Sequence, residues 1–383
     1  MAVVAGAPIL CVVGARPNFM KIAPVIRAMK SATQAVPVRL LHTGQHYDQQ
    51  MNSQYFESLG IQDPDINLEV GSASHAVQTA EIMRRFEPVL DKEKPAAVLV
   101  VGDVNSTLAC ALVAVKKGIP VIHVEAGLRS FDRTMPEEIN RVLTDQISDV
   151  LFTTEKSASK NLLREGISDT NIHFVGNVMI DTLRYSLERA VAAKQTLCHH
   201  GVPDEWERNG YAVLTLHRAS NVDDPATLRG LLRTVIEVSR RLPVIFPVHP
   251  RTRARIEQSG FKTMLEISSL VELPPLDYPE MLGLMREARV VLTDSGGIQE
   301  ETTALGIPCV TLRDNTERPV TVEEGTNTVV GLEHARILSV VDDVLQSGGK
   351  AGRVPDLWDG KASQRIVSVL HDWLAGGVHR RVA

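Results

Sequence analysis

Three acidic residues in the first half of the chain occupy positions from which they could transfer protons. Asp103 and Glu125 each follow a short apolar run, and Glu137 comes twelve residues after Glu125. Carboxylates that share one site repel each other, which separates their pKa values. One of them can then act as a general acid while another acts as a general base. This spacing makes proton transfer the first chemistry to consider.

Each of these acids also has a structural explanation. Asp103 could be a helix N-cap, which is the commoner role of an Asp after a strand. Glu125 could form a structural ion pair with Arg129 or His123, and Glu137 could stabilise a helix start through the helix dipole. Glu125 carries the stronger functional signal. It ends a strongly apolar strand, where an unpaired carboxylate is rare and therefore needs an explanation.

A second group of residues has the pattern of a phosphate site. Ser295, Gly296 and Gly297 follow an apolar run and precede a predicted helix. A helix start rich in Ser and Gly offers free backbone N–H groups and the positive end of the helix dipole to an anion. Glu301 lies about one to two turns further along, where its carboxylate could accept hydrogen bonds from two sugar hydroxyls. Together these features suit a nucleotide-diphosphate sugar.

Several basic residues follow other strands and could bind the same kind of anion. Arg16 ends the turn after the first apolar run and could grip a diphosphate, with Lys21 about one turn further on. His217 and Arg218 lie together at another strand end, where the histidine could also exchange a proton. Arg318 precedes a short helix. A plain strand–helix turn explains Arg16 equally well, and a single histidine at a strand end is more often structural.

Short apolar runs alternate with amphipathic stretches and predict the elements that position these residues. The expected strands are Ile9–Val13, Val38–Thr43, Ala97–Val101, Val121–Val124, Val150–Thr154, Ile172–Val175, Tyr211–Leu216, Val244–Val248, Ser269–Leu273, Val290–Thr293 and Pro308–Leu312. The clearest helices are Asn18–Lys30, Ala76–Leu90, Ser106–Lys117, Glu137–Ile147 and Lys361–Leu374. Such alternation predicts parallel sheets with helices on both faces.

The strand pattern weakens across 194–209 and then restarts, so we expect an α/β protein with two doubly wound, Rossmann-like domains. The N-terminal domain should span 1–176 and be joined by the C-terminal helix at 361–383. The C-terminal domain should span 177–360. Ligands of open parallel sheets bind beyond the carboxyl ends of the strands. Because the polar groups described above all follow strands, we expect them to share an interdomain cleft.

Composition argues against several classes of protein. The 383 residues include 41 basic and 46 acidic side chains, without the basic stripe typical of nucleic-acid-binding proteins. No apolar run reaches the ~18 residues of a membrane span, and the first apolar stretch is interpreted as a strand, not a signal peptide. The four widely spaced cysteines favour reduced thiols and a cytoplasmic location. The sequence has no metal-ligand cluster, no dinucleotide-binding glycine motif and no Walker lysine, so we expect no cofactor.

A series of short motifs, each weak alone, is highly specific in its order, and through it the chain resembles the non-hydrolysing UDP-N-acetylglucosamine 2-epimerases. The motifs are Gly-Ala-Arg-Pro-Asn at 14–18, Thr-Gly-Gln-His at 43–46, Gly-Asp-Val-Asn-Ser-Thr at 102–107, His-Val-Glu-Ala-Gly-Leu-Arg at 123–129, Pro-Glu-Glu-Ile-Asn-Arg at 136–141, Gly-Asn-Val-Met-Ile-Asp at 176–181, Leu-His-Arg at 216–218, Asp-Ser-Gly-Gly-Ile-Gln-Glu-Glu at 294–301 and Thr-Glu-Arg-Pro at 316–319. The chain departs from the family at Asn18, where members have an acid, and in a shorter loop after Glu125.

The resemblance implies a glycosyltransferase-B fold that interconverts UDP-N-acetylglucosamine and UDP-N-acetylmannosamine without metal or nicotinamide. In the family's reaction the C2 proton is removed and UDP is expelled across the C1–O bond, which leaves a 2-acetamidoglucal. UDP then adds back while a proton arrives on the opposite face of C2. The alternatives are a hydrolysing relative that releases UDP and N-acetylmannosamine, a transferase of the same fold, and a nucleotide-sugar sensor without catalysis.

The same resemblance implies a role for each matching residue. The residues for proton transfer are Asp103, Glu125 and Glu137, with His217 assisting near the diphosphate. The phosphate-binding residues are Arg16, Lys21, Ser295, Gly296 and Arg318, while Glu301 would bind the uridine ribose and Arg141 the sugar region. Gln45, His46 and His249 match part of a second site at which substrate activates many members. The arginine that this second site would also need is not evident at 65–71, which argues against substrate activation.

The resemblance also sets expectations for the setting of the enzyme. Its partners would be UDP-N-acetylglucosamine and UDP, with no nucleic acid and no membrane. It would work as a cytoplasmic homodimer in the synthesis of cell-surface polysaccharides.

Overall fold

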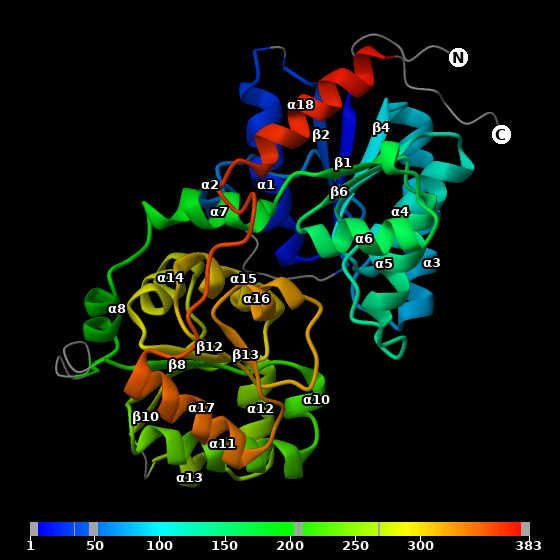
Figure 1. Ribbon diagram of the computed structural model, residues 1–383. Helices are drawn as coiled ribbons and strands as arrows, with labels where there is room; N and C mark the ends of the chain where they lie inside the picture. Colours follow the sequence, from blue (N-terminus) through cyan, green and yellow to red (C-terminus); the bar gives the residue numbers. More distant parts are fainter. Residues whose placement is uncertain are drawn as a thin grey trace. The chain divides into compact units, whose positions relative to one another are not determined.

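The computed structural model describes residues 7–33, 35–45, 53–202, 206, 210–266 and 269–376. The chain divides into two compact units, each built on its own sheet (Figure 1). Unit 1 comprises Met1–Thr182 and Asp356–Ala383, and unit 2 comprises Leu183–Pro355. The division falls within helix α7 (Val178–Leu187).

Unit 1 contains a seven-stranded sheet in the order β3-β2-β1-β4-β5-β6-β7. All neighbouring strands in this sheet are parallel. The strands are β1 (Ile9–Val13), β2 (Val38–His42), β3 (Ile66–Asn67), β4 (Ala97–Val101), β5 (Val121–Ala126), β6 (Val150–Thr153) and β7 (Ile172–Phe174). The order reverses between β1 and β4, which is where open α/β sheets bind their ligands.

Helices cover both faces of this sheet because successive side chains of a strand point to opposite faces. In β1, Ile9, Cys11 and Val13 pack in a core with α1 and α18, whereas Leu10 and Val12 pack in a second core with α3 and α4. The helices of unit 1 are α1 (Arg16–Ser31), α2 (Ser53–Ser58), α3 (His75–Glu93), α4 (Asn105–Lys116), α5 (Pro136–Ile147), α6 (Lys156–Arg164), most of α7, and α18 (Ala362–Ala375), with a 3-10 turn at Asp169–Asn171.

The last helix, α18, packs against α1 although the two are far apart in the sequence (Figure 1). The indole N–H of Trp358 donates to the carbonyl of Thr154 (3.0 Å) and joins the segment before α18 to the end of β6. Asp181 of α7 accepts hydrogen bonds from the backbone N–H groups of Ala362 and Ser363 at the start of α18. The segment from residue 356 onward is therefore an integral part of unit 1.

Unit 2 contains a six-stranded parallel sheet in the order β10-β9-β8-β11-β12-β13. Its strands are β8 (Ala212–Thr215), β9 (Val244–Pro247), β10 (Leu270–Leu273), β11 (Val290–Thr293), β12 (Cys309–Thr311) and β13 (Asn327–Val329). Its helices are α8 (Ala193–His199), α10 (Ala219–Val222), α11 (Pro225–Ser239), α12 (Pro250–Gln258), α13 (Lys262–Glu266), α14 (Tyr278–Glu287), α15 (Gly296–Leu305), α16 (Pro319–Glu323) and α17 (His334–Ser347). Here the strand order reverses between β8 and β11.

The two parallel sheets confirm the predicted α/β class. The predicted strands agree with the observed ones to within about two residues at their ends, which is the usual uncertainty of such boundaries. Two short edge strands, β3 and β13, were not predicted, because each has only two or three residues and includes asparagine. No helix among the described residues is long and apolar enough to cross a membrane.

Candidate active site

The turn between β1 and α1 is held by Asn18, one of the positions at which the chain departs from the family pattern. The Asn18 Oδ1 atom accepts hydrogen bonds from the backbone N–H groups of Gly14 (3.2 Å) and Ala15 (3.0 Å). Its Nδ2 donates to the carbonyl of Val101 at the end of β4 (3.2 Å). An ionised acid could not donate this last bond. The amide thus ties together the two strand ends where the sheet order reverses, with the half-buried Arg16 in the first turn of α1.

Glu125 lies at the end of β5 in an unusual backbone conformation. Its φ is 73°, and the pairing of β5 with β6 shifts register at this residue, so Glu125 occupies a β-bulge. The buried carboxylate forms an ion pair with the half-buried Lys21 ammonium from α1. A Cβ atom at Gly102 (φ +69°) would lie 3.3 Å from Glu125 Oε2 and 3.3 Å from Lys21 Nζ. The Glu125 carboxylate therefore lies beside Gly102, the residue that precedes Asp103.

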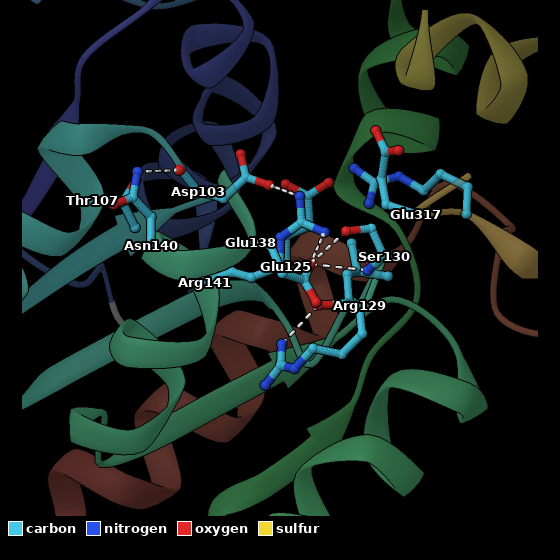
Figure 2. Close-up of polar contacts among 12 residues, drawn as sticks. Asp103, Thr107, Glu125, Arg129, Ser130, Glu138, Asn140, Arg141 and Glu317 are labelled. Carbon is cyan, nitrogen blue, oxygen red and sulfur yellow. Dashed lines mark hydrogen bonds and ion pairs between the residues drawn. The ribbon is translucent and has the colours of Figure 1, made fainter. Parts of the chain in front are cut away.

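Arg141 of α5 joins two carboxylates of unit 1 (Figure 2). Its Nη2 lies 2.5 Å from Asp103 Oδ2, and its Nη1 lies 3.1 Å from Glu138 Oε2. The neighbouring Asn140 donates from Nδ2 to the backbone carbonyl of Asp103 (2.9 Å). Two consecutive residues of α5 thus hold Asp103, one through its side chain and one through its backbone.

The two acids at the start of α5 have different surroundings. The buried Glu138 accepts hydrogen bonds from the backbone N–H and the hydroxyl of Ser130 and from the N–H of Phe131, all at 2.9 Å (Figure 2). Glu137 is half-buried, and no hydrogen bond or ion pair to it is found within the described residues. Glu138 was not among the predicted site residues. Its structural role is to order the loop before α5 and to hold Arg141.

In unit 2, Asp294 organises the strand ends where the sheet order reverses. Its buried carboxylate accepts from the backbone N–H groups of His217 (3.0 Å) and Arg218 (2.9 Å) and from Asn221 Nδ2 (3.2 Å). It also pairs with His217 Nδ1 at 2.8 Å. Burial alone would raise the pKa of Asp294, but the hydrogen bonds and charge of His217 and the backbone N–H groups lower it. The carboxylate thus fixes the imidazole of His217 through Nδ1.

A cluster of arginines surrounds Glu317 beside the glycines at the start of α15. Arg218 Nη2 lies 3.2 Å from Glu317 Oε1, and Arg313 Nη2 lies 2.9 Å from Oε2. Burial would raise the pKa of Glu317, but the charges of Arg318, Arg313 and Arg218 hold it well below its usual range. A Cβ atom at Gly296 would lie only 2.7 Å from Glu317 Oε1. Three arginine charges thus act on one buried carboxylate beside the first turn of α15.

The acids further along α15 are both buried. Glu300 Oε1 lies 2.6 Å from Arg318 Nε, so Glu300 holds one of the predicted phosphate-binding residues. Glu301 accepts a hydrogen bond from the Tyr278 hydroxyl (2.7 Å). Burial raises the pKa of Glu301 to about 7, with the Tyr278 bond opposing the shift and the charge of Glu300 adding to it.

The remaining predicted site residues are placed as follows. Ser295 is the half-buried N-cap residue of α15, and Gly297 lies in its first turn. Gln45 is buried, and its Oε1 accepts from the backbone N–H (3.0 Å) and the hydroxyl (2.7 Å) of Ser106. His249 is the N-cap of α12, where its Nδ1 accepts from the N–H of Arg251 (3.2 Å). His46 lies outside the described residues. Over those residues, no group of His, Cys, Asp and Glu side chains could hold a metal ion.

Sequence reasoning missed Asn140, Glu138, Arg313, Glu317 and Tyr278. Glu317 and Arg313 lie beside predicted residues in the segment 313–318, so a wider reading of that motif could have included them. Tyr278 follows Asp277, which forms a capping box with Glu280 and so marks a helix start after a strand.

Comparison with known proteins identifies the family of this chain. A model of the UDP-N-acetylglucosamine 2-epimerase family matches residues 28–371. The UDP-N-acetylglucosamine 2-epimerase of Methanococcus maripaludis is 42% identical over 94% of this chain and 97% of its own length. The chain belongs to the UDP-N-acetylglucosamine 2-epimerase family. Another member of similar likeness, the UDP-2,3-diacetamido-2,3-dideoxy-D-glucuronate 2-epimerase of Pseudomonas aeruginosa, is 40% identical over 94% of this chain and 99% of its own length.

Solved structures place this epimerase family member in the same fold. The crystal structure of the Methanocaldococcus jannaschii UDP-GlcNAc 2-epimerase in complex with UDP-GlcNAc and UDP superposes with a TM-score of 0.85 at 40% identity. The match covers 95% of this chain and 99% of the other. A lipopolysaccharide galactosyltransferase, WaaB, matches at 13% identity with a TM-score of 0.51, over 95% of this chain and 99% of its own, and shows the fold alone. These matches confirm the expected glycosyltransferase-B type of fold.

Proposed function

We propose that this protein interconverts UDP-N-acetylglucosamine and UDP-N-acetylmannosamine by reversible elimination of UDP. The observation that carries the proposal is the pair Asp103 and Glu125, held at the ends of adjacent strands with a fixed cation on each. The family to which the chain belongs is named for the same reaction. A carboxylate pair of this kind can serve a reaction in which one proton leaves C2 and another returns to the opposite face.

The proposed chemistry proceeds in two balanced halves. A carboxylate removes the C2 proton, the C1–O bond breaks, and its electron pair leaves with UDP, so that a C1–C2 double bond forms in a 2-acetamidoglucal. UDP then attacks C1 while a carboxylic acid delivers a proton to C2 from the other face. Since C2 is not adjacent to a carbonyl carbon, its proton is weakly acidic, and stabilisation of the departing diphosphate should contribute most.

Unit 2 supplies the groups that would stabilise this leaving group. Fixed cations and helix N-termini stabilise developing negative charge without having to reorganise. Arg218 and Arg318 are already held in place by Glu317 and Glu300, and His217 is held by Asp294. We assign these residues, with the N-terminus of α15, to the diphosphate, and Glu301 to the ribose hydroxyls.

The first experiment follows C2 directly. Purified protein is incubated with UDP-N-acetylglucosamine in deuterated water, and the C2 signal is observed by proton NMR. We expect deuterium at C2 together with a new manno-configured UDP-sugar. An unchanged C2 signal from folded protein would contradict the proposal, and free N-acetylmannosamine with UDP would identify the hydrolysing reaction instead.

The substrate named for the Pseudomonas relative gives a second candidate. That relative is 40% identical, nearly as similar as the Methanococcus enzyme at 42%, and its named substrate carries a second acetamido group and a carboxylate on the sugar. Running both UDP-sugars in the same NMR assay separates the two. A kcat/KM at least tenfold higher for UDP-N-acetylglucosamine would support our proposal, and the reverse order would reassign the substrate.

The raised pKa of Glu301 predicts how nucleotide binding depends on pH. A neutral carboxyl cannot accept from both ribose hydroxyls, whereas the ionised form can. Because the pKa of Glu301 is about 7, the affinity for UDP-N-acetylglucosamine should rise between pH 6 and 8. The affinity can rise about tenfold, because the ionised fraction of Glu301 increases about tenfold over this pH range. Calorimetry on Asp103→Asn protein, in which turnover is strongly slowed, measures this binding. Adding Glu301→Gln to the same protein should abolish the rise. An equal rise in both proteins would contradict the assignment.

We also infer, from the family resemblance, that the enzyme is a cytoplasmic homodimer that supplies cell-surface polysaccharide synthesis. Light scattering of the purified protein would show twice the mass of one chain, and the mass of a single chain would contradict the dimer.

A further inference from the structure

We propose that His123 and Asp145 form a buried clamp that positions Asp103 and Glu125 for proton transfer. The proposal rests on the proposed function, because it assigns a purpose to groups that are not themselves in contact with substrate. The His123–Asp145 clamp consists of these two side chains and their hydrogen bonds to the backbone of Gly102 and Gly127. Both side chains are fully buried.

The clamp reaches both catalytic strand ends from one imidazole. His123 lies in β5, and its Nε2 lies 2.8 Å from the carbonyl oxygen of Gly102, the residue before Asp103. Its Nδ1 lies 2.7 Å from Asp145 Oδ1 on α5. Gly102 has a φ of +69°, a backbone conformation that favours glycine. The hydrogen bond from His123 holds the peptide between Gly102 and Asp103 in place.

Asp145 secures the bulge that carries Glu125 from both sides. Its Oδ1 faces His123, two residues before Glu125, and its Oδ2 accepts from the N–H of Gly127, two residues after it (3.1 Å). Glu125 itself has a φ of 73°, a strained conformation for a residue with a side chain, which persists only where neighbouring contacts enforce it. One carboxylate thus binds both flanks of the strained residue.

Arg129 joins the clamp to a second carboxylate. Each ring nitrogen of His123 has a hydrogen-bond partner, Asp145 Oδ1 for Nδ1 and the Gly102 carbonyl for Nε2. The Nη1 atom of Arg129 lies 2.7 Å from Asp145 Oδ2, and Arg129 also binds Glu165 through two hydrogen bonds. Asp145 is thus held by an imidazole, a guanidinium and a backbone N–H, and buried polar networks rigidify a site when their members are satisfied in this way.

The geometry of Gly127 leaves little room for the bulge to move. A Cβ atom there would lie 2.4 Å from the carbonyl oxygen of Ala158, and its φ is +80°. The backbone on the far side of Glu125 is therefore packed tightly against α6, while the near side is held by His123. A displacement of about 1 Å at a catalytic group can reduce the rate about 100-fold, so a clamp of this kind has a measurable effect.

The test compares His123→Gln and Asp145→Asn with wild-type protein. We expect kcat to fall by about 100-fold, with KM changed less than about threefold, because substrate-binding groups are untouched. Asp149→Asn is the matched control, since Asp149 Oδ2 accepts from Val121 N at the opposite end of β5 (2.9 Å). Its kcat should stay within about threefold of wild type, because its carboxylate lies away from both catalytic strand ends.

A second measurement needs no variant and no activity. In wild-type protein, the Gly127 amide should be among the slowest to exchange with deuterated solvent in unit 1, because it donates to a buried carboxylate. Both clamp variants should accelerate it, and the control should not. Rapid exchange of Gly127 in wild type, or variants with wild-type kcat, would overturn the clamp. Slow exchange in a protein inactive on every UDP-sugar would keep the clamp and reject the proposed function.

Discussion

Asp103→Asn and Glu125→Gln proteins should each turn over UDP-N-acetylglucosamine about a thousand-fold more slowly than wild type, because positioned acid–base groups contribute about 10²–10⁴-fold each. The amides keep the shape of the side chains but cannot exchange a proton. Binding of UDP should remain, since neither Asp103 nor Glu125 is among the residues assigned to the nucleotide. The NMR assay gives the rates, and calorimetry with UDP gives the affinity.

Controls for this prediction come from the same unit. Asp91→Asn removes an exposed carboxylate that pairs with Lys117, and its rate should equal wild type within error. Glu125→Gln also leaves the half-buried Lys21 ammonium without its opposite charge, which should destabilise unit 1 by up to about 3 kcal/mol. Circular dichroism must therefore show that the variant is folded at the assay temperature. Wild-type rates in either active-site variant would reject the assignment of these carboxylates.

Replacing Asp294 by asparagine should both destabilise unit 2 and remove nucleotide binding. The carboxylate accepts from the backbone of His217 and Arg218, from Asn221 and from the His217 ring. An asparagine presents an N–H₂ group to some of these donors, so buried donors lose their acceptor at a cost of about 3 kcal/mol in total. Amide hydrogen exchange of β8 and β11 measures the free energy of opening of this unit.

The free energy of unfolding that Asp294→Asn loses relative to wild type should depend on pH. Because the pKa of Asp294 is lowered on folding, its contribution is present above the ordinary pKa of an Asp and is lost as pH falls. Wild type and Asp294→Asn should therefore differ most at neutral pH and converge in acid. Asp342→Asn, which removes an exposed pair with Arg241, should change stability by less than about 0.5 kcal/mol. A neutral effect at Asp294 would show that the network contributes nothing to folding.

Strand positions could be predicted from the sequence because both faces of each sheet are buried. Such strands become continuous apolar runs, and the polar residues after them gather at one sheet edge whatever the details of packing. The positions of Asp103 and of Asp294 relative to their strands follow from this rule alone. The pairing of Glu125 with Lys21 does not, because it depends on a contact across 104 positions of sequence.

The orientation of α5 illustrates what pattern reading could not supply. Its apolar residues Ile139 and Leu143 are about half exposed, whereas its polar residues Glu138, Arg141 and Asp145 are buried. A hydrophobic stripe normally marks the buried face of a helix, so the usual rule would turn α5 the wrong way. The buried face here carries charges that pair with β4, β5 and their loops. These partners become visible only in the three-dimensional structure. The hydrophobic-stripe rule fails at α5, as such rules do at functional sites, where polar residues must be buried.

The packing of α18 on α1 has a consequence for the order in which the protein can be built. Residues 183–355 form one continuous stretch, so this unit has its whole sequence once residue 355 has left the ribosome. Unit 1 must wait, because Ile366 and Leu370 of α18 belong to the core that covers β1. Most of unit 1 is translated first, yet unit 1 is completed last. Unit 2 can therefore fold while unit 1 still exposes part of its interior.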